Sequence, residues 1–131
     1  MDPTSASLVS LFHDVSKGGI AGVREGDPHQ PRYLRTSEAE RRRTGEEFTF
    51  NRGMTTLSLP AASLWLVSSF VPLSATEAQA ILAHDGQYVY GNREYAHRLE
   101  PEALLLCQAD EASLLYEREL LHEGLDTRPE E

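Results

Sequence analysis

Metal-binding side chains stand at three informative places in the sequence: the adjacent pair His13-Asp14, then His84, then Asp110. The pair follows a short apolar run. A histidine and a carboxylate that are adjacent at a helix end can both coordinate one divalent ion, from two sides. Taken alone, the pair also fits an ordinary helix end, and His84 alone fits a capping or surface histidine favoured by the helix dipole.

Asp110 lies in an apolar stripe, with Leu106 and Leu114 one helical turn away on either side. A carboxylate in such a setting is costly unless it is paired or ligates a metal ion. The stripe therefore predicts one of two roles for Asp110, a structural pairing with an arginine or helix cap, or metal ligation.

Hydrophobic periodicity and capping signals predict the elements that position these residues. We expect helices over residues 5–14, 56–70 and 75–84, and a last helix from Pro101 toward His122. The helix over 56–70 carries two apolar stripes, which predicts burial on most of its sides. Ser74 and Glu77 form a capping box at the start of the third helix. No stretch shows a convincing strand pattern, so we expect one all-α domain of four to five helices over residues 1–125, with a polar tail at 126–131.

Residues 18–53 form a long irregular segment rich in Gly and Pro, typical of a lid or a mobile region. Within it, Ser37 and Glu40 match a second capping box and predict a short polar helix through Arg41–Arg43. That arginine run is interpreted as a solvated helix end, with a phosphate-facing role as the alternative. Phe48 and Phe50 are expected to tie the end of the segment to the core.

Composition excludes several classes of protein. The chain of 131 residues has a formal net charge of -9, which disfavours binding of long nucleic acid. A small phosphorylated ligand remains compatible, because a metal ion can invert the local field. The single cysteine and the absence of a basic leader or a long apolar run predict a cytoplasmic protein without a membrane span.

The order of these residues, together with the segments around them, resembles the HD-domain metal-dependent phosphohydrolases, in particular the small bacterial and phage type. Leu11-Phe12-His13-Asp14-Val15-Ser16-Lys17 looks like the family signature of two apolar residues, His-Asp and a following Lys. The stretch from Phe70 to His84 and the stretch from Leu104 to Asp110 are similar to two further family segments. The resemblance covers residues 8 to about 118.

The resemblance implies a helical bundle that holds a divalent metal ion (Mn, Mg, Co, Ni or Fe) between helices. Its ligands would be His13, Asp14 and Asp110, and a metal-activated water would attack a phosphorus centre. Asp14, His84 and Lys17 would take part in catalysis. His84 would face the phosphate or a second metal ion, and Lys17 would lie near the substrate phosphate.

Two features depart from the family pattern. A position often occupied by His before the central helix falls on or near Arg52, which could contact a phosphate instead. The family also has a metal-binding His on a helix before the His-Asp pair, whereas twelve residues precede His13 here and none is His. We therefore expect a second copy or another protein partner to cover residues 5–14, and that partner could supply a ligand.

These observations predict a metal-dependent phosphohydrolase acting on a nucleotide or another small phosphate ester. The alternative is a degenerate HD domain that binds a nucleotide or a protein without turnover, and a purely structural or assembly role is a third possibility.

Overall fold

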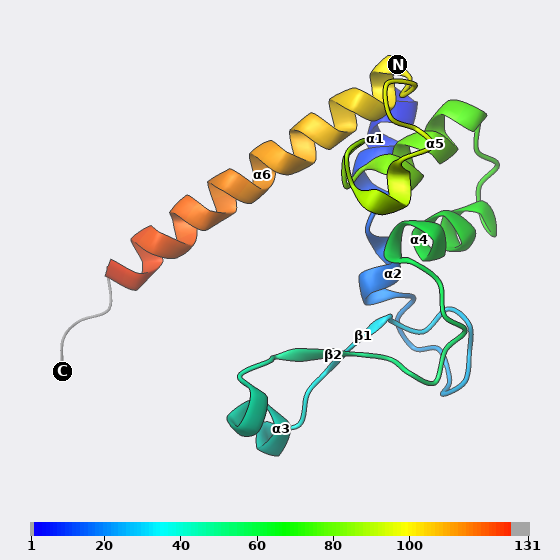
Figure 1. Ribbon diagram of the computed structural model, residues 1–131. Helices are drawn as coiled ribbons and strands as arrows, with labels where there is room; N and C mark the ends of the chain where they lie inside the picture. Colours follow the sequence, from blue (N-terminus) through cyan, green and yellow to red (C-terminus); the bar gives the residue numbers. More distant parts are fainter. Residues whose placement is uncertain (1, 127–131) are drawn as a thin grey trace.

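The computed structural model describes the backbone of residues 2–126 and the side chains of residues 2–119. The body of the molecule contains α1 (Pro3–Phe12), α2 (Val15–Gly18), α4 (Leu59–Ser68), α5 (Ala75–Ala83) and the start of α6 (Pro101–Asp126) (Figure 1). A short 3₁₀ helix, η1 (Tyr90–Asn92), lies in the connection between α5 and α6. The described chain is mostly helical, as predicted, but it has six α-helices where four to five were expected.

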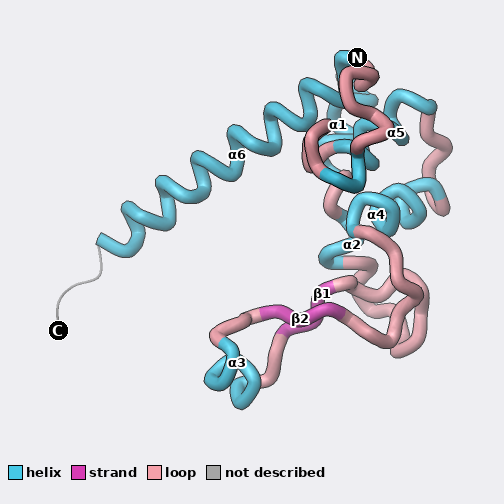
Figure 2. The backbone as a smooth tube through the Cα atoms, in the orientation of Figure 1, coloured by secondary structure: helices cyan, strands magenta, loops and turns pink. Residues whose placement is uncertain are grey.

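A lobe extends from the body and consists of β1 (Tyr33–Arg35), α3 (Glu38–Thr44) and β2 (Phe48–Phe50) (Figure 2). The strands pair antiparallel, with Tyr33 opposite Phe50, and those two rings pack at a centroid distance of 5.0 Å. The expectation of no strand was therefore wrong, because strands of three residues are too short to show an alternating pattern. The prediction that Phe48 and Phe50 reach the core was also wrong: they are 54% and 47% exposed in the lobe.

Helix α3 begins as its capping signal predicts. Ser37 is the N-cap and its side chain accepts a hydrogen bond from the Glu40 N–H, and Gly45 ends the helix in a left-handed conformation. Arg42 pairs with Glu38 one turn earlier, and no residue of α3 is buried. The arginine run is thus part of a solvated helix, in agreement with the first interpretation.

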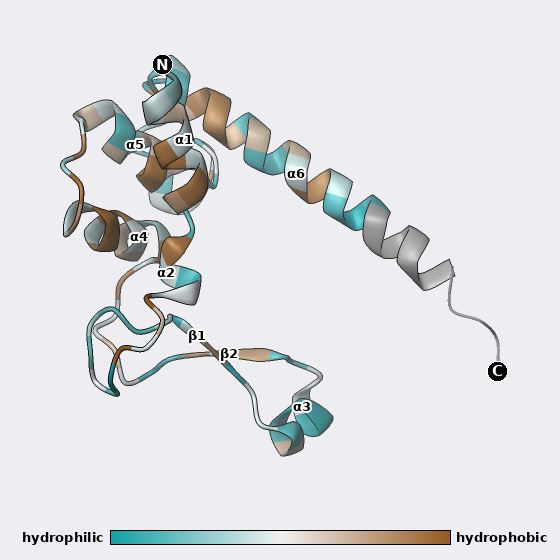
Figure 3. Ribbon diagram, turned by 180° about the vertical axis from the view of Figure 1, so that it is seen from behind, coloured by the Kyte–Doolittle hydropathy of each residue, from teal (hydrophilic) through white to brown (hydrophobic). Residues whose placement is uncertain are grey.

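Helix α6 begins on the body and continues well beyond it (Figure 1). In Figure 3 the most hydrophobic residues gather on the body helices and on the first turns of α6, whereas α3 is hydrophilic. The helix passes the predicted end near His122 and runs to Asp126. The tail predicted for residues 126–131 lies outside the described residues, apart from Asp126.

No helix in the described part of the chain has both the length and the apolar character needed to cross a membrane.

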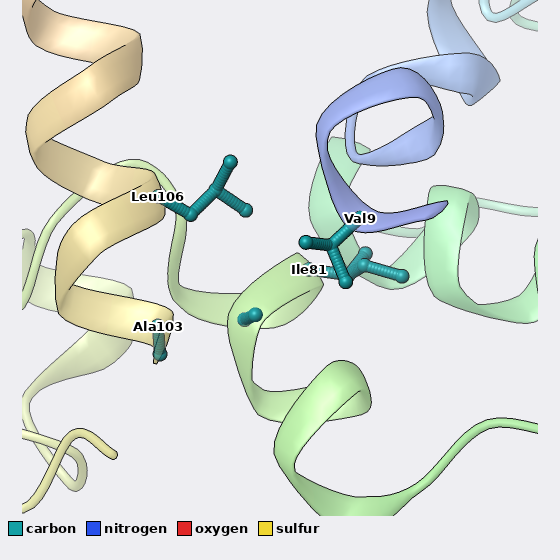
Figure 4. Close-up of a cluster of buried hydrophobic side chains, with 5 residues drawn as sticks. Val9, Ile81, Ala103 and Leu106 are labelled. Atoms are coloured by element: carbon teal, nitrogen blue, oxygen red, sulfur yellow. The ribbon is translucent and has the colours of Figure 1, made fainter. Parts of the chain in front are cut away.

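The core is built around α5, which packs against α1, α4 and α6. Ala80 and Ile81 of α5 are completely buried, and Val9 of α1 and Ala103 and Leu106 of α6 are buried around them (Figure 4). Small side chains at 80 and 103 let the helices approach closely, so that α1 and α6 both end up against α5.

Helix α4 is buried most deeply on one face and is partly buried around most of the rest, in agreement with the prediction. Its inner face carries Ala62, Ser63, Leu66 and Val67. Trp65 on the opposite stripe is 38% exposed. Helix α4 packs against α2 and α5 on its inner face, and on its outer side the loop before β1 places His29 against Trp65.

A pair of buried serines joins α2 to α4. The Ser16 N–H donates to Ser63 Oγ at 3.1 Å, the Ser63 hydroxyl donates to Ser16 Oγ at 2.9 Å, and the Ser16 hydroxyl donates to the Leu59 carbonyl at 3.0 Å. Because both serines are buried, each polar group depends on these partners.

We predict that Ser63→Ala lowers the free energy of unfolding by about 1–3 kcal/mol, because it leaves the buried Ser16 N–H without an acceptor. Chemical denaturation measures the change. The matched control is Ser68→Ala on the exposed side of α4, which should change stability by no more than about 0.5 kcal/mol. Equal losses in the two variants would contradict the importance of the serine pair.

The start of α5 is held by Glu77. Its side chain accepts a hydrogen bond from the Ser74 N–H at 2.7 Å, which confirms the predicted capping box, and another from the Ser5 hydroxyl of α1 at 2.5 Å. The Ser5 hydrogen bond, followed by that of the Ser74 N–H, lowers the pKa of Glu77 below its ordinary value. A depressed carboxyl pKa means that the stabilisation is present above the unfolded pKa and is lost as the pH falls through the folded pKa.

We predict that Glu77→Gln destabilises the protein by about 1 kcal/mol near neutral pH. The difference in free energy of unfolding between wild type and variant should shrink as the pH falls through the depressed pKa of Glu77. The wild-type carboxyl group is then protonated and, like the amide of the variant, carries no charge. Denaturation curves over a pH series measure this gap, with the exposed Glu25→Gln as control. A gap that stays constant into acid would refute the assignment.

Candidate metal centre

Two histidines occupy equivalent places at the ends of α1 and α5. His13 and His84 are the C-cap residues of these helices. His13 Nδ1 bonds the Ser10 carbonyl at 2.9 Å, and His84 Nδ1 bonds the Ile81 carbonyl at 2.8 Å. Since a carbonyl only accepts, Nδ1 carries the proton in both rings and Nε2 of each neutral ring presents a lone pair. A backbone partner that fixes the ring and its tautomer is typical of metal-binding histidines.

Carboxylate oxygens surround the two Nε2 atoms. Asp110 Oδ1 lies 3.3 Å from His13 Nε2, while Asp14 Oδ1 and Asp85 Oδ1 lie 3.3 Å and 3.2 Å from His84 Nε2. The two imidazole rings meet edge to face, with centroids 4.7 Å apart. Helices α1, α5 and α6 and the turn before α2 thus bring five polar side chains to one place.

This arrangement needs a positive charge between its members. With neutral histidines, lone pairs of nitrogen face lone pairs of carboxylate oxygen, which repel unless a proton or a metal cation stands between them. Asp14 Oδ1 is buried and has no hydrogen-bond partner among the described residues. A buried acceptor without a donor is costly, so the site fits a bound cation.

The most compact ligand set is His13, His84 and Asp110, whose ligand atoms all lie within 4.8 Å of one another. The sequence predicted His13, Asp14 and Asp110, so His84 takes the place of Asp14 in this set. Asp14 lies beside this ligand set, with its Oδ1 at 3.3 Å from His84 Nε2. Two imidazoles and a carboxylate form a mixed nitrogen and oxygen set that suits Mn, Fe, Co, Ni or Zn.

Lys17 lies beside Asp14 at the edge of this cluster. Its Nζ donates to Asp14 Oδ2 at 2.5 Å, so one oxygen of Asp14 is engaged and the other faces His84. Desolvation opposes the charge of Lys17, but the hydrogen bond and charge of Asp14, with the charges of Asp110 and Asp85, outweigh it and raise its pKa. Lys17 is therefore a cation throughout the neutral range.

Asp110 pairs with His13, so its polar partner in the apolar stripe is a histidine of another helix. Its side chain is 28% exposed.

One turn before Asp110, the Cys107 thiol donates to the Ala83 carbonyl at 2.9 Å, and burial raises the pKa of this thiol. Cys107 thus serves to pack α6 on the end of α5.

Asp85 is the site residue that sequence reasoning missed, because Asp85-Gly86 was interpreted only as a helix end. The available signal was a repeated pattern: His84-Asp85 after α5 has the same order as His13-Asp14 after α1.

Arg52 was expected at the site, but it lies in the exposed turn after β2, and no described hydrogen bond or ion pair joins it to the cluster.

We predict that the metal-free protein binds one divalent ion, detectable with Co²⁺ by visible absorption or with Mn²⁺ by magnetic resonance. Asp110→Asn and His13→Gln should each weaken binding by at least about tenfold. The control Glu111→Gln changes the neighbouring exposed carboxylate of α6 and should bind as wild type does. Loss in the control equal to that of Asp110→Asn, or no binding by wild type, would refute the site.

Comparisons of the chain with protein-family models, with curated proteins and with solved structures find no match. The chemistry proposed for the site therefore rests on its own side chains.

Proposed function

We propose that the protein is a metal-dependent phosphohydrolase of the HD type that acts on a nucleotide or another small phosphate ester. The observation that carries the proposal is the convergence of two orientation-locked imidazoles and Asp110 beside a buried, unsatisfied oxygen of Asp14. A cationic lysine borders the same oxygen cluster. Ligands, an acceptor and a phosphate-binding charge are the parts that this reaction requires.

His13, His84 and Asp110 would hold the divalent ion. When bound, such an ion supplies Lewis-acid activation of water and of a phosphoryl oxygen. The side chain of His84 is 3% exposed, which supports a role as a ligand deep in the site more than a role as a direct phosphate contact. His13 is 16% exposed and Asp110 28%, so a ligand can approach from their side.

Lys17 and Asp14 supply the remaining functions. The Lys17 side chain is 48% exposed, so its ammonium group can contact a phosphate oxygen from solvent while it stays beside Asp14. A cation placed there lowers the cost of the negative charge that develops during transfer. The Asp14 side chain is 33% exposed beside the ligand set, and its carboxylate would orient an attacking water and take its proton.

The alternative remains a domain that binds a nucleotide or a protein without turnover. The ion pair between Lys17 and Asp14 favours this alternative, because Lys17 already compensates part of the negative charge of Asp14. The expected partner over residues 5–14 also remains a proposal, supported by Leu11 and Phe12 of α1, which are 73% and 38% exposed.

The proposal predicts phosphate release from members of a nucleotide panel in the presence of Mn²⁺, Mg²⁺, Co²⁺ or Ni²⁺. Asp110→Asn should lower kcat/KM by at least about a hundredfold through loss of the ion, and added metal should restore part of it. Lys17→Met should lower kcat/KM by about a hundredfold with metal binding retained, because the charge toward the phosphate is lost while His13, His84 and Asp110 are unchanged.

Glu111→Gln serves as control and should keep wild-type activity. Ion binding without turnover of any panel member would reject the hydrolase and favour the binding domain. Turnover that survives complete chelation would reject the metal-based mechanism.

A further inference from the structure

A cavity that shares no residue with the metal cluster lies at the base of the lobe. Its volume is about 300 Å³, and its walls come from the loop before β1, the turn before α4 and the outer side of α4. This volume is in the range of cavities that hold small organic ligands. The residues that matter for its chemistry are Asp27, Arg32, Gly53, Met54 and Trp65.

Arg32 is a buried cation that lacks a counter-charge. The residue is 5% exposed, and its backbone is fixed by hydrogen bonds to Ser16 and Asn51. Nη1 donates to the Thr55 carbonyl. Among the described residues Arg32 forms no ion pair with a carboxylate, and no other hydrogen bond satisfies its guanidinium group. Asp14 Oδ1 is the only fully buried and unpaired side-chain N or O atom among the described residues, so the remaining N–H groups of Arg32 are not sealed from solvent, and they match a phosphate or carboxylate.

The other walls offer a ring surface and an acceptor. Trp65 stacks on His29 at a centroid distance of 5.3 Å, which holds the indole in place at the edge of the cavity. Met54 adds apolar surface beside it. Asp27 Oδ1 accepts hydrogen bonds from the backbone and ring N–H groups of His29, at 2.8 Å and 2.7 Å, so its carboxylate is already partly compensated.

We propose that this cavity binds a small aromatic anion, with the anionic group on Arg32 and the planar ring against Trp65 and Met54. The chemical class is that of a nucleoside monophosphate or an aryl carboxylate. The cavity is a site separate from the metal cluster, so it would hold a ligand that is not undergoing hydrolysis.

Trp65 is the one tryptophan of the chain, so its fluorescence reports directly on this cavity. Adenosine monophosphate, adenosine and inorganic phosphate are titrated into the full chain with a chelator present. We expect a change in Trp65 fluorescence with the monophosphate, and binding at least about tenfold tighter than that of adenosine or of phosphate alone. Phenyl phosphate and benzoate, compared in the same way, identify which anionic group Arg32 prefers.

Two variants at Gly53 provide a matched pair. A Cβ added to this residue meets only Asn51 Oδ1, at 3.4 Å, and its backbone is not in the left-handed region. Gly53→Asp places a negative charge in the cavity wall and should weaken binding of the monophosphate by at least about tenfold. Gly53→Asn has the same size without the charge and should bind within about threefold of wild type. Arg32→Gln should also lose binding, and the Gly53 pair decides the outcome if that variant does not fold.

Asp110→Asn tests the separation of the two sites and should leave the fluorescence titration unchanged. Loss of binding in Asp110→Asn would overturn the proposal, because the ligand would then occupy the metal cluster. Equal binding of adenosine and its monophosphate, equal binding of inorganic phosphate, or equal effects of the two Gly53 variants would overturn it as well.

Discussion

Burial of the inner face of α5 is the constraint on which the rest of the structure depends. Ala80, Ile81 and Ala83 have no exposed surface, because α1, α4 and α6 all pack against this helix. Small side chains permit this close packing, and any displacement of α5 would open cavities against its neighbours. His84, at the end of α5, is consequently held in one place, and α1 and α6 carry His13 and Asp110 to it.

The electrostatics of the site follow from that packing. Each histidine donates its Nδ1 proton to a carbonyl of its own helix, so that the two Nε2 atoms turn toward the carboxylates of Asp14, Asp85 and Asp110. Helix packing therefore concentrates acceptors at one point, an arrangement that opposes folding unless a cation compensates it. Buried groups that are unfavourable for stability are commonly retained at functional sites, and the orphaned Asp14 oxygen is such a group.

Ser16 connects the site to the lobe. Its hydroxyl and N–H bind α4, and its carbonyl accepts the backbone N–H of Arg32, whose own carbonyl accepts that of Asn51. The base of the lobe is thus attached to α2, next to Asp14 and Lys17. By contrast, the outer part of the lobe contributes nothing to the core, since α3 has no buried residue and Phe48 and Phe50 remain partly in solvent.

The sequence by itself determined the starts of α4, α5 and α6, and the family resemblance placed His13, Asp14, Lys17, His84 and Asp110 at one site. Ser58, Ser74 and Pro101 mark helix starts through interactions within one turn, and such local interactions can be inferred from neighbouring residues. Only the tertiary structure decided that His84 joins His13 and Asp110, that Asp85 is also present and that Arg52 is not. These outcomes depend on distances between helices far apart in the chain, which are set by packing and leave no mark in local sequence patterns.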